Sequence, residues 1–141
     1  MVEFERVYVD ASVILGLTLR EPQALRVKWK SAIASELLTV ETFRTIDRLR
    51  LTRLTQPEAA RFRKAADANL GGIELIPLDS TVLRRAAGYF PKPVGTLDAI
   101  HLATALMWYE SRGDLVMLTR DRQLAIAAQV SGLQVYPRLI R

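Results

Sequence analysis

The sequence contains no cysteine, and this absence excludes disulfide bonds, zinc sites built on thiolates and cysteine nucleophiles. Histidine occurs only once, at position 101, so oxygen donors are the main candidates for any metal site. Long apolar runs are missing as well, because acids such as Asp10, Glu21 and Asp98 interrupt them before they reach the roughly 20 residues of a membrane span. We therefore expect a soluble protein with no membrane partner.

The first six residues, MVEFER, carry two acids before any apolar segment. A secretory signal peptide has the opposite pattern, with a basic start, an apolar stretch and a small-residue cleavage site. The absence of cysteine also fits a reducing compartment. We therefore expect a cytoplasmic protein.

Basic residues are in excess in a chain of ordinary domain length. Its 141 residues are half hydrophobic, which predicts a single domain spanning residues 1–141. Twenty Lys and Arg residues against fifteen Asp and Glu residues give a net charge of +5, and arginine greatly outnumbers lysine. A guanidinium group can pair with phosphate through two parallel hydrogen bonds, so this balance favours a nucleic-acid partner. A basic surface that is simply hydrated explains the charge alone equally well.

The first part of the chain reads as a strand followed by helices. A run of β-branched and aromatic residues, 6–9, predicts a strand that ends at Asp10, and residues 11–19 follow with a helical pattern. A proline suits the first turn of a second helix over residues 23–35. Residues 37–40 then predict a short strand or an extended link.

The rest of the chain alternates between the two kinds of element. Thr55 and Glu58 have the spacing of a capping box, with a proline between them in the first turn. The pattern predicts helices over residues 41–54, 55–70, 80–89, 96–113 and 121–130, and strands over residues 73–78, 115–118 and 133–136. This alternation predicts the α/β class, as a three-layer α/β/α domain with a short central parallel sheet.

Four acids stand at the starts of predicted elements. Asp10 and Asp121 directly follow strands, where open parallel sheets place their sites, and Glu41 and Asp98 lie in the first turns of helices. The four converge if these elements are neighbours at one edge of the sheet. Carboxylate oxygens are the ligands preferred by Mg²⁺ or Mn²⁺, and such ions bind phosphate oxygens and activate water. The arrangement leads to the hypothesis of a metal-assisted nuclease.

Each acid also has a structural interpretation, because the helix macrodipole alone favours acids near helix N-termini. Two hydroxyl residues raise a similar choice, since Ser12 follows Asp10 by two residues and Thr119 precedes Asp121 by two. Each hydroxyl is placed either to donate a hydrogen bond to a carboxylate or to cap a helix. The sequence leaves both alternatives open.

Two further residues stand near the acids. His101 lies three residues after Asp98, and this helical spacing places both on one face. We interpret His101 as a packing or supporting residue rather than a ligand, because a hard oxygen site rarely includes imidazole. Glu36 lies close to Glu41 in the sequence and competes with it for the same role.

Four stretches of the sequence resemble the PIN-domain family, and in particular the VapC-type toxins of bacterial and archaeal toxin–antitoxin pairs. They are VYVDASVIL, LLTVETFRTI, GTLDAIHLATAL and LTRDRQLAIAA, and they occur in the order found in the family. The resemblance extends from residue 7 to about residue 137 and so covers almost the whole chain.

The resemblance implies a compact parallel sheet flanked by helices. It also implies an acidic quartet around Mg²⁺ or Mn²⁺, formed by Asp10, Glu41, Asp98 and Asp121. The hydroxyls of Ser12 and Thr119 match positions that accompany the first and last acids in the family. By this resemblance the chain would be an endoribonuclease that cuts RNA and is inhibited by a cognate antitoxin lying across its cleft.

Three expectations concern partners and alternatives. A homodimer is expected, with the apolar positions of the helices predicted over residues 23–35 and 55–70 as interface candidates. The alternative to an enzyme is a catalytically inactive PIN-like module that binds RNA or protein. A phosphatase with Asp10 as nucleophile is disfavoured, because position 12 is serine where that chemistry needs a second acid.

Overall fold

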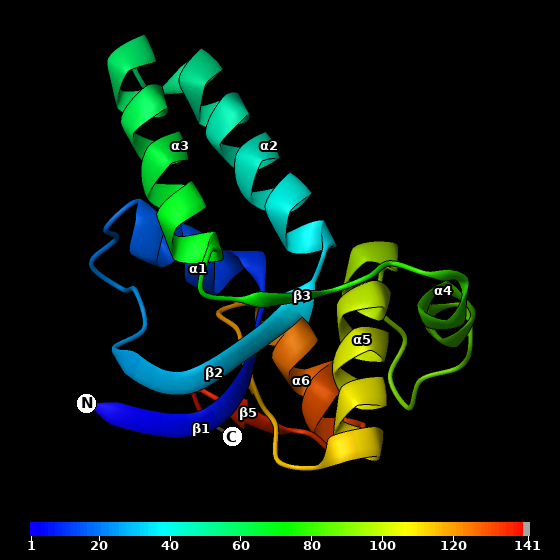
Figure 1. Cartoon of the computed structure of the whole chain (residues 1–141). Coiled ribbons are helices and arrows are strands. Elements are labelled where there is room, and N and C mark those ends of the chain that lie inside the picture. Colours follow the sequence, from blue (N-terminus) through cyan, green and yellow to red (C-terminus); the bar gives the residue numbers. More distant parts are fainter. Residues whose placement is uncertain (140–141) are drawn as a thin grey trace.

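The structure, a computed structural model, describes residues 1–139 and contains a five-stranded parallel sheet (Figure 1). The strand order is β3-β2-β1-β4-β5, so the first strand of the chain lies at the centre of the sheet. The strands are β1 (Val2–Val9), β2 (Val27–Ser35), β3 (Glu74–Ile76), β4 (Val116–Leu118) and β5 (Gln134–Tyr136). Parallel strands need crossover connections, and helices supply them here.

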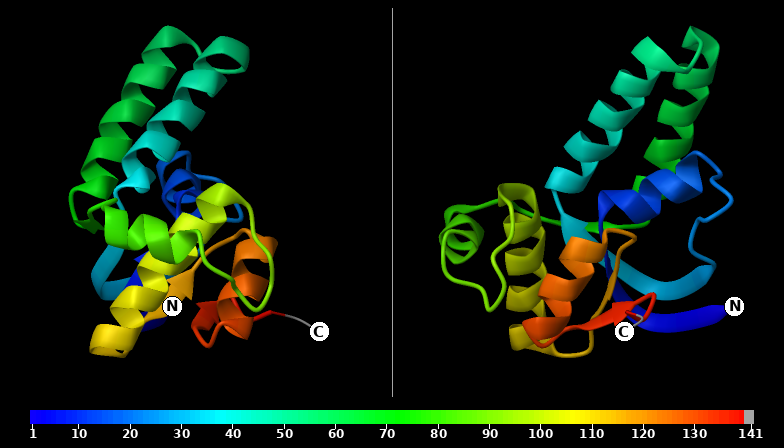
Figure 2. Two further views of the ribbon diagram at one scale, coloured as in Figure 1. Left: turned by 90° about the vertical axis from the view of Figure 1, so that its right-hand side faces the viewer. Right: turned by 180° about the vertical axis from the view of Figure 1, so that it is seen from behind.

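Helices cover both faces of the sheet, which confirms the predicted three-layer α/β/α architecture (Figure 2). One face packs against α1 and the sheet-proximal ends of α2 and α3, and the other packs against α5 and α6. The short helix α4 packs on the outer side of α5. The helices are α1 (Ala11–Thr18), α2 (Leu37–Thr52), α3 (Gln56–Leu70), α4 (Ser80–Ala86), α5 (Thr96–Arg112) and α6 (Arg122–Val130).

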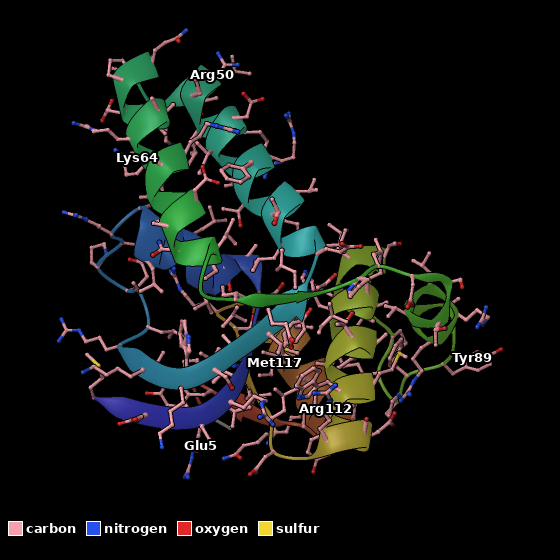
Figure 3. The ribbon with its side chains drawn as sticks, viewed as in Figure 1. Glu5, Arg50, Lys64, Tyr89, Arg112 and Met117 are labelled. Atoms are coloured by element: carbon pink, nitrogen blue, oxygen red, sulfur yellow. The ribbon has the colours of Figure 1, made fainter. Side chains whose placement is uncertain are left out.

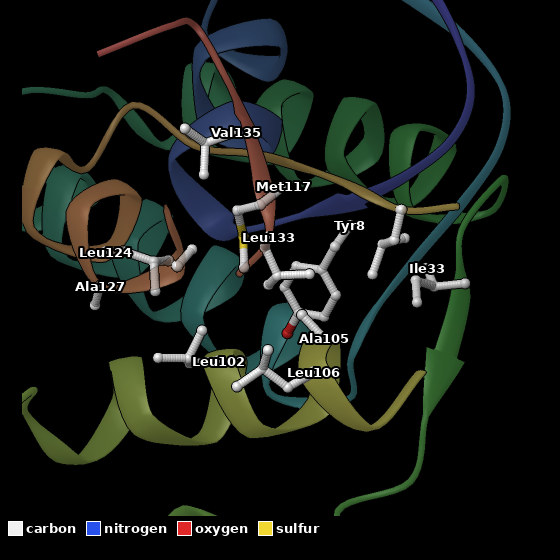
Figure 4. Close-up of a cluster of buried hydrophobic side chains, with 12 residues drawn as sticks. Tyr8, Ile33, Leu102, Ala105, Leu106, Met117, Leu124, Ala127, Leu133 and Val135 are labelled. Carbon is white, nitrogen blue, oxygen red and sulfur yellow. The ribbon is translucent and has the colours of Figure 1, made fainter. Parts of the chain in front are cut away.

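The central strand contributes alternate side chains to two hydrophobic cores. Val7 and Val9 belong to the cluster beneath α1, whereas Tyr8 belongs to the cluster beneath α5 and α6. Figure 4 shows this second cluster, to which α5 contributes Leu102 and α6 contributes Leu124. All five residues have 0% of their surface exposed, so β1 is tightly packed on both faces of the sheet. A rigid β1 gives the residue that follows it a defined position.

Helices α2 and α3 form a hairpin that extends away from the sheet (Figure 1). The predicted capping box starts α3: Glu58 N donates to Thr55 Oγ1 at 3.2 Å, and Thr55 N donates to Glu58 Oε1 at 2.9 Å. Arg50 and Lys64 lie on the part of this hairpin that is far from the sheet (Figure 3). The hairpin thus carries basic side chains into solvent.

Two of the predicted elements are wrong. The helix predicted over residues 23–35 is replaced by β2. Leu25, Trp29 and Ile33 recur at a helical spacing, but Val27 and Trp29 alternate with lysines as in a strand. Pairing with β1 on one side and β3 on the other selects the strand. The strand or link predicted over residues 37–40 is instead the first turn of α2, so Glu41 lies in the second turn of its helix rather than the first.

These corrections also remove one predicted dimer surface, because residues 27–35 are part of the central sheet. The other, α3, buries Ala59, Ala66 and Leu70 within its own chain.

The remaining differences between the predicted and observed elements are small. Strand β1 begins earlier than predicted, α4 ends at Ala86 rather than at residue 89, and Gly95 rather than Thr96 is the N-cap of α5. Across residues 1–139, no helix has the length and apolar character to cross a membrane.

Candidate active site

The candidate site lies where β1 and β4 end. Strand order reverses direction around β1, since the chain proceeds from β1 to β2 and β3 on one side and to β4 and β5 on the other. Ligands of open parallel sheets bind at such a switch point, beyond the carboxyl ends of the strands. Val9 pairs with Leu118, so Asp10 and Thr119 leave two neighbouring strands side by side.

The Asp10 carboxylate is buried, with 6% of the residue exposed. Ser12 Oγ donates a hydrogen bond to Oδ1 at 2.6 Å, and Thr119 Oγ1 donates one to Oδ2 at 2.7 Å. Burial raises the pKa of Asp10, and the two hydroxyl hydrogen bonds act against this rise. Among the described residues no Lys or Arg forms a salt bridge with it. A buried carboxylate with only neutral donors is costly, and a cation would relieve that cost.

The same two hydroxyls also hold the loop that leads to α6. Arg120 N donates to Ser12 Oγ at 2.9 Å, and Asp121 N donates to Thr119 Oγ1 at 2.9 Å. Each hydroxyl therefore donates to Asp10 and accepts from the backbone of the β4–α6 loop. Of the two alternatives left open by the sequence, the structure favours the carboxylate contact for both residues.

Asp121 is an exposed residue and the N-cap of α6. Its Oδ1 accepts hydrogen bonds from Gln123 N at 2.9 Å and from Leu124 N at 3.3 Å. For Oδ1 the structural interpretation therefore holds, because this oxygen caps the N-terminus of α6. Oδ2 has no hydrogen-bond partner within residues 1–139, so the capping contact leaves it available.

Asp98 lies in the first turn of α5, but no side chain caps this helix. The carboxylate is half-buried, and no hydrogen bond or salt bridge joins it to another side chain of the described chain. Burial raises the pKa of Asp98, and the negative charge of Asp121 raises it further, as do those of Asp10 and Glu41. The charges of the other three predicted acids therefore all reach Asp98, although the four residues come from different parts of the chain.

Glu41 reaches the same site from α2. Its Oε1 lies 2.6 Å from His101 Nε2 of α5, and the side chain is 22% exposed. The competing acid Glu36 has a different role, because its Oε1 accepts from Leu78 N at 2.5 Å and so ties the start of α2 to the loop after β3. The structure thus separates the two candidates and brings Glu41 to the site.

Two hollows adjoin the acids. One, of about 340 Å³, lies beside Thr119 and Asp121 and is lined by several cationic side chains, those of Arg120, Arg122 and Arg138. The other, of about 300 Å³, is bounded by Asp98, Lys92 and Gln123. Cationic side chains in hollows beside the acids can bind the phosphates of a nucleic acid.

The donor set suits a hard divalent cation. All four acids supply oxygen, and Asp98, Asp121 and Glu41 each retain an oxygen without a protein partner among residues 1–139. In the described range, however, no three His, Asp or Glu side chains are already arranged as a metal cage. The chemistry of the donors fits Mg²⁺ or Mn²⁺, and binding an ion would require the free oxygens to turn toward one another.

One residue of the site was not singled out in the sequence. Tyr8 is 0% exposed, and its hydroxyl lies 2.6 Å from His101 Nδ1. The only available signal was a tyrosine between two valines, two residues before Asp10. His101, which we interpreted as a supporting residue, lies between Tyr8 and Glu41.

The fold and these side chains define a parallel α/β domain with a cluster of acids at its topological switch point. Residues 7–130 match the family model described as PIN domain, and the chain belongs to the PIN domain family.

The relatives of the chain include a protein named Ribonuclease VapC46 from Mycobacterium tuberculosis, which is 35% identical over 92% of this chain and 95% of the relative. Among solved structures, VapBC2 of Rickettsia felis bound to a promoter DNA fragment matches with a TM-score of 0.61 and 10% identity, covering 92% of this chain and 96% of that one. VapBC-5 of Mycobacterium tuberculosis matches with a TM-score of 0.55 and 17% identity over the same shares. At these identities the two structures establish the fold alone.

Proposed function

We propose that this chain is a VapC-type endoribonuclease that hydrolyses RNA phosphodiester bonds with the help of Mg²⁺ or Mn²⁺. The observation that carries the proposal is Asp98, a half-buried carboxylate without a partner in the described chain, held among three other acids at a switch point. Membership of the PIN domain family and the relationship to a protein named as a ribonuclease support the same reaction.

Asp10, Glu41, Asp98 and Asp121 would hold the divalent ion, which supplies an activated water molecule and stabilises charge on the phosphate when it is bound. The residues of the chain then have separate tasks. Ser12 and Thr119 fix the Asp10 carboxylate in one orientation, and the amides at the start of α6 fix Asp121. Preorganised groups of this kind need little rearrangement during the reaction.

The flanking cations would position the RNA. Arg122 and Arg138 line one hollow beside the acids, and Lys92 lines the other. Arginine binds phosphate with two parallel hydrogen bonds, whereas lysine acts as a point charge. RNA would therefore pass the acids with its backbone held by cations in both hollows.

An antitoxin is the proposed protein partner, because the two similar structures come from VapBC systems, one of them described as a toxin–antitoxin system. A cytoplasmic location fits such a pair. We further propose that residues 1–141 act as one domain, and the homodimer stays a prediction.

The test is incubation of the purified protein with total RNA, with and without EDTA, followed by addition of Mn²⁺. We expect cleavage that EDTA abolishes and Mn²⁺ restores. Asp98→Asn is the matched control, and it should lower cleavage by at least ~100-fold, the usual cost of removing one preorganised group. Cleavage that survives EDTA would contradict the metal-dependent mechanism. RNA binding without cleavage would instead favour the inactive PIN-like module.

A further inference from the structure

A chain of hydrogen bonds runs from the backbone of β2 to Glu41. Ser35 N donates to the Tyr8 hydroxyl at 3.1 Å, the same hydroxyl lies 2.6 Å from His101 Nδ1, and His101 Nε2 lies 2.6 Å from Glu41 Oε1. Tyr8 is 0% exposed and His101 is 2% exposed. The chain thus links β2, β1, α5 and α2 through the buried interior.

The donors and acceptors in this chain determine which nitrogen of His101 carries its proton. The Tyr8 hydroxyl has a single proton to donate. Because its oxygen already accepts from Ser35 N, we assign that proton to His101 Nδ1, which lies 2.6 Å away. An imidazole that accepts at Nδ1 carries its proton on Nε2, so His101 donates to the Glu41 carboxylate.

The imidazole ring is also held sterically. The Tyr8 and His101 rings meet edge to face, with centroids 5.8 Å apart and planes at 80°. Both ring nitrogens are occupied, one by Tyr8 and one by Glu41. His101 therefore has no lone pair left for a metal ion, which agrees with its interpretation as a supporting residue.

Glu41 needs such support more than Asp10 and Asp121 do. Asp10 is held by two hydroxyls and Asp121 by two backbone amides. Glu41 has a longer side chain, and its only hydrogen bond from another side chain within residues 1–139 comes from His101. A free glutamate side chain loses considerable rotamer entropy when it is fixed, and a hydrogen bond made beforehand reduces that loss on ligand binding.

We propose that His101, locked by Tyr8, is a positioning residue that fixes Oε1 of Glu41 and leaves Oε2 for the acidic site. This inference rests on the proposed function for its effect on catalysis, but the hydrogen-bonded chain can be tested without any reaction. Partners that orient a metal-binding carboxylate or histidine typically change metal affinity or activity by about 10–100-fold when they are removed.

The decisive comparison is between two substitutions of His101 by amide side chains of different length. His101→Gln places an N–H close to the position of Nε2 and keeps a donor for Glu41, whereas His101→Asn reaches only the Tyr8 side. We expect His101→Asn to weaken Mn²⁺ binding, measured by titration calorimetry, by about 10–100-fold and to lower kcat with little change in KM. His101→Gln should recover most of both losses. Equal losses in the two variants, with both folded by circular dichroism, would overturn the proposal.

A measurement on the unmodified protein keeps the proposal testable even where the variants fail to fold. His101 is the only histidine, so its two ring nitrogens give unambiguous signals in nitrogen NMR. We expect Nε2 to carry a proton, with the Nε2 signal shifted in Glu41→Gln and the Nδ1 signal shifted in Tyr8→Phe. A ring protonated at Nδ1 would refute the proposal.

A double substitution separates this inference from the proposed function. In the Glu41→Gln background, His101→Asn should cause no further loss of Mn²⁺ affinity, because its effect passes through Glu41. Additive losses would show that His101 acts in another way. If the unmodified protein neither binds Mn²⁺ nor cuts RNA, the proposed function fails, and the NMR result alone decides whether His101 positions Glu41.

Discussion

Thr119 Oγ1 donates a hydrogen bond to Asp10 Oδ2 at 2.7 Å across a sequence separation of 109 residues. The two residues follow the neighbouring strands β1 and β4, so the parallel pairing of these strands brings them together. Thr119 is 2% exposed, which makes the contact inaccessible to water. A charged acceptor in such surroundings depends strongly on each donor that it retains.

Replacing Thr119 by valine should therefore destabilise the protein through Asp10. The valine keeps the shape of the side chain but removes the donor, and hydrogen bonds to charged groups contribute about 1.5–3 kcal/mol. We expect a loss of this size in the free energy of unfolding, measured in urea. Thr119→Ser keeps the hydroxyl and is the matched control, with a much smaller loss. Similar losses in the two variants would mean that packing rather than the hydrogen bond matters at this position.

The raised pKa of Asp98 predicts a characteristic dependence of the stability of the protein on pH. Its pKa is raised in the folded chain, mainly by burial, so its ionised form destabilises the fold above that pKa. As the pH falls through the raised pKa toward the ordinary value of 3.8, this penalty disappears. Asp98→Asn should thus be more stable than the unmodified protein at neutral pH without metal, by about 1 kcal/mol or less because solvent screens a half-exposed charge.

The check is urea unfolding of both proteins between about pH 4 and pH 8 in the presence of EDTA. The advantage of Asp98→Asn should shrink toward zero on the acidic side. A variant that is less stable than the unmodified protein at every pH would mean that Asp98 supports the fold, and the argument from mutual repulsion would be wrong.

Divalent ions should reverse the order of stability of the two proteins. An ion that binds only the folded chain stabilises it by about 2.7 kcal/mol at a hundredfold excess over its Kd. Mn²⁺ should therefore raise the Tm of the unmodified protein by several degrees and that of Asp98→Asn far less. The buffers contain no Ca²⁺, and the control is KCl at three times the MnCl₂ concentration, which has the same ionic strength. An unchanged Tm in millimolar Mn²⁺ would argue against a metal site.

Sequence patterns were sufficient for the fold class and for the positions of most helices, because strands and helices alternate with clear capping signals. The capping box at Thr55 is an example in which a local motif determines a local structure. The strand β2 was missed for a different reason, since its apolar spacing fits both periods and only its pairing with β1 and β3 resolves the ambiguity. Such pairing is a property of the whole sheet and is not encoded in the segment itself.

The site residues likewise fall into two groups: those that local sequence rules predict and those that only the folded structure brings together. The positions of Asp10 and Asp121 follow from local rules, because Asp10 directly follows β1 and Asp121 lies in the short loop after β4. The contact between Tyr8 and His101 spans 93 residues, and no local pattern connects them. The misassigned start of α2 had a further consequence, since it placed Glu41 in the first turn, where the macrodipole alone would explain it.

Glu36 and Glu41 therefore offer a matched pair for the last prediction. Glu36 is exposed and accepts a hydrogen bond from Leu78 N, whereas Glu41 contacts His101 at the site. We expect Glu41→Gln to reduce metal-dependent RNA cleavage by at least ~100-fold with little loss of stability. Glu36→Gln should retain cleavage and lose up to about 1 kcal/mol of stability, because a neutral amide is a weaker acceptor for the Leu78 amide. Both variants are compared by initial cleavage rates in Mn²⁺ and by urea unfolding. If Glu36→Gln is the inactive member of the pair, the fourth acid of the site has been assigned to the wrong turn of α2.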